Sequence, residues 1–257
     1  MELNDDFFNN IKIEKRIIDG AQIELPIRYY KDEVMMGAFI APTSRIKSVL
    51  PTTRFKPVEI LPSLSLVSII GLRHIDTSIG PFNELDIGIP VFFDSNLVIP
   101  FYSALKYHSN PNFGTYMLKL YVSDKKALTA GIKVWNYPKV IADIIFEENE
   151  SHKTMIISKD NNKILTLKAI NKGILTEKYN AIFNIFSIKD NMILKSPVNW
   201  RGERFSKRFK NIISFDLGDS EFSKELKSLN LMNYCVEGSI YPELQYILNV
   251  PTNIYNL

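Results

Sequence analysis

A lysine stands directly after a Tyr-Pro pair in Tyr137-Pro138-Lys139, and apolar runs lie on both sides of it. Proline fixes its own φ and favours extended geometry in the residue before it, so the backbone that leads into Lys139 is stiff. The flanking apolar residues place the amine next to, or inside, a dry environment. A lysine in such surroundings has a lowered pKa and can act as a neutral amine nucleophile. We therefore hypothesise that Lys139 is a catalytic nucleophile; a solvated lysine at a strand end is the alternative.

Other patterns that carry chemistry are absent from the sequence. It has no GxGxxG, Walker, CxxC or HExxH motif, and its single cysteine, Cys235, has no partner for an internal disulfide or a metal site. His74 and Asp76 would share one face of a strand, as a metal-binding or acid–base pair. Two ligands without a third favour a simple polar pair. We therefore expect no metal and no organic cofactor.

Composition and charge narrow the class of partner. The apolar fraction of 46% and charged fraction of 23% are ordinary for a globular protein, and the net charge is only +3. The basic run at residues 201–210 contains two aromatics, which would suit stacked bases along a phosphate backbone. A solvated loop or a strand edge protected by charge is favoured instead, because no other basic surface accompanies it. We expect no nucleic-acid partner.

Nothing in the sequence predicts a membrane segment or a signal peptide. No apolar run reaches about 18 residues, and the acidic start, Met1 to Asp6, lacks a positive region followed by an apolar one. The expected location is the cytoplasm, without a membrane partner.

Short apolar runs recur along the chain and predict strands, at residues 34–41, 64–72, 87–93, 97–105, 116–122 and 140–146. A hairpin is expected at residues 155–167, because the Asp160-Asn161-Asn162 turn tolerates positive φ. Short helices are expected at residues 43–50, 125–130 and 219–229, with Gly131 as a turn. Since no repeat or linker is visible, the pattern predicts one β-rich domain over residues 1–257.

The segment Gly131-x5-Tyr137-Pro138-Lys139 resembles the active-site segment of the acetoacetate decarboxylase family. The similarity continues upstream through residues 116–122 and 127–130. A second block, residues 79–91, resembles the family's Gly-x-x-x-Glu…Ile-Pro-Val segment and places Glu84 on the family's active-site glutamate. Most of residues 26–170 is included.

This resemblance implies a mainly β fold, an antiparallel closed barrel or cone-like sheet with a few short helices, assembled as a homo-oligomer. It implies that Lys139 forms a Schiff base with a β-keto acid, most simply acetoacetate, which then loses CO2 without a cofactor. Glu84 would move a proton or orient water, and its alternative is a surface carboxylate in a turn. Tyr137 and Leu120 would form apolar walls around the substrate.

The sequence departs from the family pattern beside the lysine. Val140 stands where decarboxylases have a second lysine, so burial would have to activate Lys139. Gly131-Ile132-Lys133 replaces Gly-Arg-Glu, and Lys133 either supplies the missing cation or is a surface residue. Arg28 is the candidate for binding the substrate carboxylate, with an exposed strand residue as the alternative.

These departures keep two other functions open. One is a Schiff-base aldolase-dehydratase that acts on pyruvate-like keto acids and aldehydes. The other is a non-catalytic member of the family that binds a small ligand.

Overall fold

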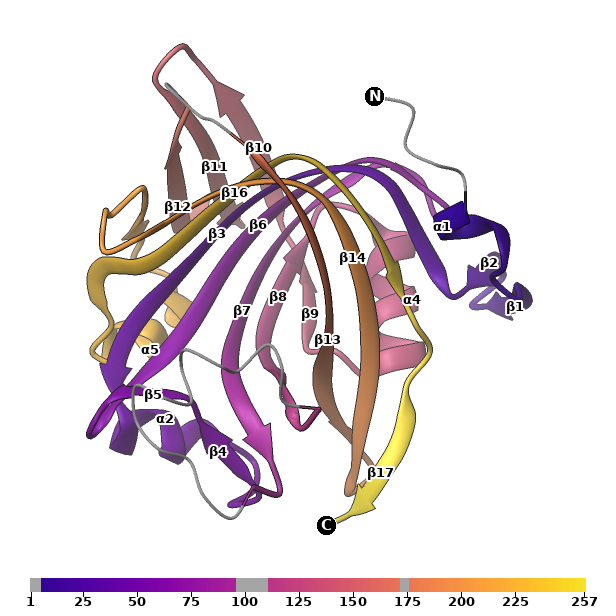
Figure 1. The fold of residues 1–257 in the computed structure, drawn as a ribbon, viewed down its shortest axis with the longest axis horizontal. Helices are drawn as coiled ribbons and strands as arrows, with labels where there is room; N and C mark the ends of the chain where they lie inside the picture. Colours follow the sequence, from indigo (N-terminus) through magenta and orange to yellow (C-terminus); the bar gives the residue numbers. More distant parts are fainter. Residues whose placement is uncertain (1–5, 96–110, 172–175) are drawn as a thin grey trace.

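The computed structural model describes residues 6–95, 111–171 and 176–257 (Figure 1). The apolar run predicted as a strand at residues 97–105 therefore lies outside the described residues. Two short helices and three short strands lie at the periphery: α1 (Asp6–Asn9), α2 (Thr43–Val49), β4 (Phe55–Pro57), β5 (Glu59–Leu61) and β17 (Thr252–Asn256).

Seven long strands close into a mixed β-barrel, which confirms the predicted mainly β fold. In order around the barrel they are β7 (Phe82–Phe93), β6 (Leu64–Thr77), β3 (Ile27–Pro42), β16 (Met232–Leu248), β14 (Met192–Arg208), β13 (Glu177–Lys189) and β8 (Phe113–Val122). The pairing of β8 with β7 closes the ring. The predicted all-antiparallel arrangement needs one correction, because β13 runs parallel to β8.

The strands alternate between the interior of the barrel and its outer face. On β6, Ser68 and Ile70 line cavities inside the barrel, whereas Val67 and Ile69 pack outward into a second core. A sheet that is covered on both faces selects continuous apolar strands, which explains the apolar runs in the sequence.

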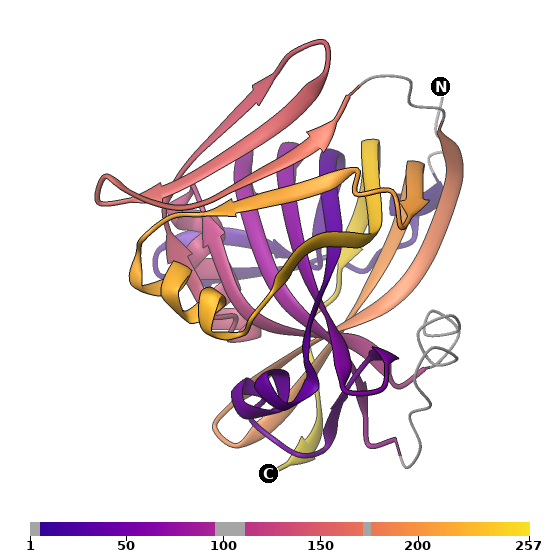
Figure 2. The same ribbon diagram turned by 90° about the vertical axis from the view of Figure 1, so that its left-hand side faces the viewer.

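That outer core lies under a four-stranded sheet formed by β10 (Asp143–Glu148), β11 (His152–Lys159), β12 (Asn162–Ile170) and β15 (Ile213–Leu217). Figure 2 shows this sheet crossing the barrel strands, with helix α5 (Glu221–Ser228) beside it. Met155 and Leu167 of the sheet belong to the same apolar cluster as Phe39 of β3. The hairpin predicted at residues 155–167 is confirmed as β11 and β12, and Asp160 and Asn161 in its turn have positive φ.

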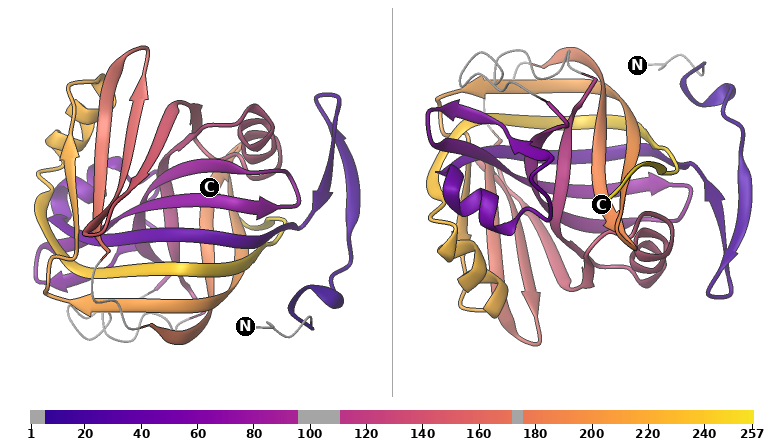
Figure 3. Two further views of the ribbon diagram at one scale, coloured as in Figure 1. Left: turned by 90° about the horizontal axis from the view of Figure 1, so that it is seen from above. Right: turned by 90° about the horizontal axis from the view of Figure 1, so that it is seen from below.

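A second hairpin, β1 (Glu14–Ile18) with β2 (Ala21–Leu25), stands apart from the barrel strands in Figure 3. Most of the basic run is part of β14 (Met192–Arg208). Residues 201–203 pair with β13 and β16 at once, Arg204 pairs with β13, and residues 205–208 pair with β16 alone among the described strands. The run therefore starts inside the barrel wall, against the prediction, and its later part is a strand edge among the described residues, as predicted.

Within the described residues, no helix is long and apolar enough to cross a membrane.

Candidate active site

A helix and a short strand bring Lys139 to the barrel. Helix α4 (Lys125–Trp135) begins at Asp124, whose side chain accepts a hydrogen bond from the Ala127 N–H. It ends at Asn136, which adopts the left-handed conformation and donates its N–H to the carbonyls of Gly131 and Ile132. The chain then enters β9 (Lys139–Ile141), which pairs in parallel with β8. The helix predicted to end at residue 130 thus continues through Gly131, because its C-cap residue is Asn136.

Gly131 makes room for the Lys139 side chain. An added Cβ at position 131 would lie 2.5 Å from both Cδ and Cε of Lys139, inside any real contact distance. Gly131 therefore lies inside a helix, where it leaves space for the Lys139 side chain, and it does not form a turn. The position of the Lys139 amine therefore depends on which residue occupies position 131 of α4.

We expect the substitution Gly131→Ala to reduce turnover at least tenfold while the protein stays folded. Alanine favours a helix over glycine by up to about 1 kcal/mol, which offsets part of the cost of the clash. The atoms it meets belong to the flexible end of Lys139, so the lysine moves rather than the backbone. Initial rates and thermal unfolding on the same preparation check both parts, and unchanged turnover would show that the lysine tolerates displacement.

Lys139 lies at one end of a row of four buried ionisable side chains. Its Nζ atom is 2.6 Å from Oε1 of Glu84, and Oε2 of Glu84 is 3.5 Å from Nε2 of His74. On the other side of the ring, His74 Nδ1 lies 2.8 Å from Oδ2 of Asp32. The row runs from β9 past β8 to the three adjacent strands β7, β6 and β3, and every one of its side chains is at most 7% exposed.

The charges in this row determine one another. Burial raises the pKa of Glu84, but the charges of Lys139 and His74 outweigh it and lower the pKa to about 2. Burial lowers the pKa of His74, but Asp32 and Glu84 outweigh it and raise the pKa to about 9. For Asp32, burial dominates and raises the pKa. Near neutral pH, His74 is therefore a cation that lies between the carboxyl groups of Asp32 and Glu84.

This arrangement predicts how stability depends on pH. Because folding raises the pKa of His74 from 6.5 to about 9, its contribution is complete below pH 6.5 and is lost as the pH rises through 9. We expect the free energy of unfolding to fall over this window, by up to about 3 kcal/mol. Urea unfolding at several pH values measures it.

The matched variants for that measurement are His74→Gln and His152→Gln, which remove a buried and an exposed histidine respectively. The first should flatten the dependence between pH 6.5 and 9, whereas the second should leave it in place. Equal slopes for wild type and His74→Gln would contradict the assignment of a charged His74.

Asp86 is a further carboxyl group at the site. It lies two residues after Glu84 on the same face of β7 and lines the same cavity. Burial, followed by the charge of Glu84, raises the pKa of Asp86 well above its usual range. A carboxyl group with a raised pKa therefore lies beside one with a lowered pKa, which is the arrangement that separates an acid from a base.

The cavity next to Lys139 has a volume of about 70 Å³. Leu120 and Tyr137 line it. The rest of the lining is formed by Tyr29, Ile70, Leu72, Glu84, Asp86, Thr115, Met117, Phe183, Ile185, Val198, Trp200, Tyr246 and Leu248. Among these described lining residues, Lys139 carries the only cationic side chain. We call this space the Lys139 cavity.

The structure does not bring Arg28 to this cavity. Neighbouring residues on β3 face opposite sides, so Tyr29 lines the cavity and Arg28 points away from it. The Arg28 guanidinium forms an ion pair with Glu24 and lies 5.9 Å from the centre of the Tyr30 ring. The alternative of an exposed strand residue does not describe Arg28 either, because it is only 6% exposed.

The neighbours of Lys139 in the sequence also face away from it. Lys133 is exposed and lies 3.7 Å from Asp19, so it does not supply a cation to the cavity. Val140 packs against the core under the four-stranded sheet, on the opposite side of β9 from the Lys139 cavity. A side chain at position 140 in this geometry is directed out of the barrel.

Asp32 was not identified from the sequence, and His74 was paired with a different residue. His74 pairs with Asp32 instead of Asp76, because β3 and β6 place Asp32 opposite His74. The described residues contain no group of three or more His, Cys, Asp or Glu side chains that could hold a metal ion. Asp86 was also missed, although the sequence could have indicated it: it follows Glu84 by two residues in a strand, and such residues share one face.

The model of the acetoacetate decarboxylase family matches residues 19–181, which is more than half of the chain. The chain belongs to this family. Members of the family are largely lyases. No curated protein sequence matches this chain significantly.

Solved structures of family members share the fold at low sequence identity. An acetoacetate decarboxylase from Legionella pneumophila is 13% identical with a TM-score of 0.68, and the match covers 90% of this chain and 88% of that one. An acetoacetate decarboxylase-like enzyme from Sphingomonas wittichii RW1 is 11% identical with a TM-score of 0.59, covering 92% and 96%.

The enduracididine biosynthesis enzyme MppR, complexed with pyruvate, is 9% identical with a TM-score of 0.61, and the match covers 90% of this chain and 91% of that one. MppR has also been solved with the condensation product of pyruvate and imidazole 4-carboxaldehyde.

Proposed function

We propose that this protein is a cofactor-independent lyase in which Lys139 forms a Schiff base with a β-keto acid and so promotes loss of CO2. The observation that carries the proposal is the contact between the Lys139 amine and the Glu84 carboxylate at 2.6 Å, beside an enclosed cavity. An amine nucleophile with a proton-accepting group in contact is the arrangement that imine formation needs.

The first half of the reaction uses Lys139 and Glu84. Lys139 must give up a proton before it attacks; Glu84, the carboxylate in contact with its Nζ atom, takes that proton and later passes it to the hydroxyl group that leaves as water. The free amine attacks the ketone carbon, and the adduct loses water to give a protonated imine. The carboxylate of Glu84 then stabilises the positive charge of that imine across the same short contact.

The second half uses the imine as an electron sink. The bond between the α-carbon and the carboxylate breaks, its electron pair moves to the imine nitrogen, and CO2 leaves an enamine behind. Asp86 lines the cavity and keeps its proton because of its raised pKa, so we assign it the protonation of the enamine carbon. Water then hydrolyses the imine, which releases the ketone and restores Lys139, and Asp86 regains its proton from the solvent.

Loss of CO2 also suits the chemistry of the cavity wall. The described lining holds two carboxyl groups and only one cation, Lys139 itself, so a substrate carboxylate meets no guanidinium there. Converting that carboxylate into neutral CO2 removes a charge from an apolar space. The reaction therefore relieves an electrostatic cost that binding creates.

The aldolase-dehydratase function is the second candidate. It is favoured by the structural likeness to MppR, which has been solved with pyruvate and with a condensation product. Both functions share the imine at Lys139 and differ in what happens to the enamine, which takes up either a proton or an aldehyde.

Product analysis separates the two functions. Acetoacetate should give acetone and CO2 above the spontaneous rate, whereas pyruvate mixed with an aldehyde should give no condensation product. Condensation without CO2 release would move the protein to the aldolase class. Neither product, from several keto acids, would leave the non-catalytic binding function.

We also propose that the protein acts in the cytoplasm as a homo-oligomer, as the family resemblance implies. Light scattering coupled to gel filtration gives its subunit number.

A further inference from the structure

We propose that the Lys139 cavity continues into a second, apolar cavity, and that the two together bind a 3-oxo acid whose chain ends in an aromatic ring. This inference rests on the proposed function, because it names the substrate class of the same site. We call the second cavity the apolar arm.

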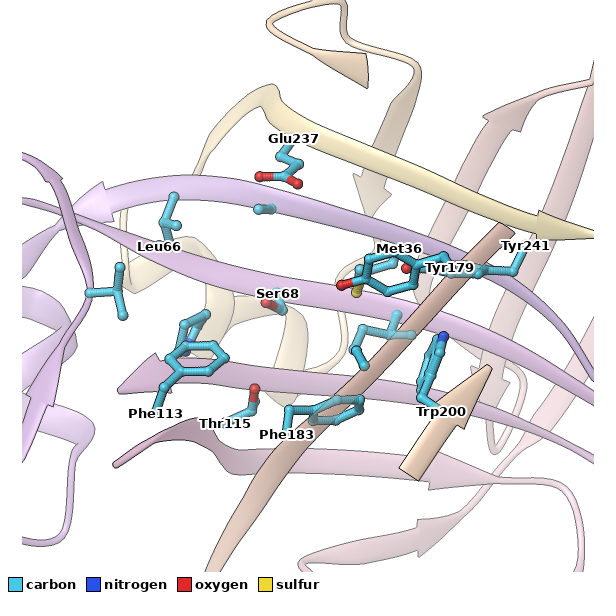
Figure 4. Close-up of a pocket in the computed structure, with 15 residues that line it drawn as sticks. Met36, Leu66, Ser68, Phe113, Thr115, Tyr179, Phe183, Trp200, Glu237 and Tyr241 are labelled. Atoms are coloured by element: carbon cyan, nitrogen blue, oxygen red, sulfur yellow. The ribbon is translucent and has the colours of Figure 1, made fainter. Parts of the chain in front are cut away.

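The apolar arm lies inside the barrel, and Figure 4 shows the side chains that line it. Its volume is about 110 Å³. Four residues line both spaces: Ile70, Thr115, Phe183 and Trp200. A ligand that is attached to Lys139 therefore needs to pass only these side chains to reach the arm.

Small side chains create the space for the arm. Ala38 on β3, Ser68 on β6 and Ala181 on β13 all line it, at positions where a larger residue would fill the barrel. Protein interiors are normally packed without voids of this size, and core side chains interdigitate. Because three small residues on separate strands all face this cavity, we infer that the cavity binds a ligand.

The lining of the arm selects an apolar, aromatic group. Five of its residues are aromatic: Phe113, Tyr179, Phe183, Trp200 and Tyr241. No Lys, Arg or His is among the described lining residues, and the single charged one is the carboxylate of Glu237. Aromatic walls favour a ring in edge-to-face or offset contact, and the Glu237 carboxylate disfavours a second anionic group.

Trp200 supplies an independent sign of a ligand. Its side chain lines both cavities, the residue is 7% exposed, and its Nε1 atom is buried with no hydrogen-bond partner among the described residues. A buried donor without an acceptor is costly, and a ligand acceptor would remove that cost. A 3-oxo acid has its acceptors at the end that reaches Lys139 and its apolar chain beyond them, so the apolar chain would extend toward the arm.

The size of the combined space agrees with an aromatic substituent. The two cavities together exceed about 150 Å³, the volume of an engineered apolar cavity that binds benzene. Acetoacetate has only a methyl group to direct away from the reacting carbons, and it would leave the arm unfilled. A phenyl group on a two-carbon chain would fill it.

Comparing two substrates of the same chemistry tests the proposal. We expect kcat/KM for 3-oxo-5-phenylpentanoate to exceed that for acetoacetate at least about tenfold, because the arm buries the phenyl group. Ala181→Leu should lower the ratio of the two values at least about tenfold. Ile182→Phe, on the exposed outer face of the same strand, is the matched control and should leave the ratio unchanged. If Ala181→Leu does not fold, Ser68→Leu fills the arm from another strand.

A binding measurement separates failure of this inference from failure of the proposed function. The ketone 4-phenylbutan-2-one, the expected product, should change the Trp200 fluorescence of the Lys139→Met protein, and Trp200→Phe should remove that signal while Trp135 remains. Weaker binding in Ala181→Leu would support the arm even if no keto acid reacts. The inference would be overturned if the proteins with and without Ala181→Leu bound the aromatic ketone equally well, or if acetoacetate were the preferred substrate. Either result would count against it whatever the outcome at Lys139.

Discussion

Replacing Lys139 with methionine is expected to lower kcat/KM for β-keto acids by at least about 10⁴-fold and to leave the barrel folded. Methionine has a similar length and an apolar side chain, so it fills the same buried space without a nucleophilic nitrogen. Glu84 loses one of its two cationic partners but keeps His74 within 3.5 Å. We therefore expect a loss of stability below the roughly 3–5 kcal/mol that removing one partner of a buried ion pair usually costs, and a protein that stays folded.

Rates of CO2 release and a urea unfolding curve measure the two effects. Lys133→Met is the matched control, because Lys133 is an exposed lysine on the preceding helix and makes only a 3.7 Å contact with Asp19. It should retain full turnover. Residual activity of Lys139→Met within tenfold of wild type would remove this lysine from the mechanism.

The substitution Glu84→Gln is expected to lower kcat by about 10²–10⁴-fold, which is the usual range for loss of a positioned acid or base. Glutamine keeps the size of Glu84 but cannot accept a proton from Lys139 or balance the charge of the imine. The effect should fall on the steps that move protons. Imine formation needs the same proton transfer and should also be slowed, so the adduct should be detectable only on long incubation.

Two observations make that result specific. Glu33→Gln is the matched control, since Glu33 contacts Lys153 at 2.8 Å and does not line the Lys139 cavity. Its turnover should equal that of wild type. If Glu84→Gln turns over normally, Glu84 is a structural partner of Lys139 and His74 rather than a proton carrier.

The sequence predicted the part of the site that is local in the chain. Tyr137 and Lys139 belong to one short segment, and Leu120 pairs with Lys139 across neighbouring strands. Glu84 was placed by a second segment that resembles the family. The structure puts these four residues around one cavity, while their roles remain proposals.

The buried row beyond Glu84 could not be predicted in the same way. Asp32 and His74 are 42 residues apart, and only the register of β3 against β6 brings them together. Register is a property of the whole sheet, so no local pattern indicates it. The same limitation applies to Arg28, because a shift of one residue along a strand exchanges the two faces, and here Tyr29 takes the inner one.

The boundaries of helices and strands could likewise be predicted where they depend on local residues, and not where they depend on distant ones. The hairpin at residues 155–167 followed from its turn residues, whose positive φ is a local property. The end of helix α4 did not, because Gly131 was interpreted as a turn although it accommodates Lys139 from a later strand. A glycine that serves a contact distant in the sequence cannot be distinguished from a turn glycine by spacing alone.

Borohydride trapping tests the central claim, that Lys139 forms an imine, most directly. The protein is incubated with acetoacetate, reduced, digested and examined by mass spectrometry. We predict an isopropyl adduct on the peptide that carries Lys139, and none on the corresponding peptide of Lys139→Met. An unmodified Lys139 after incubation with several keto acids, or equal labelling of exposed lysines such as Lys133, would contradict the account.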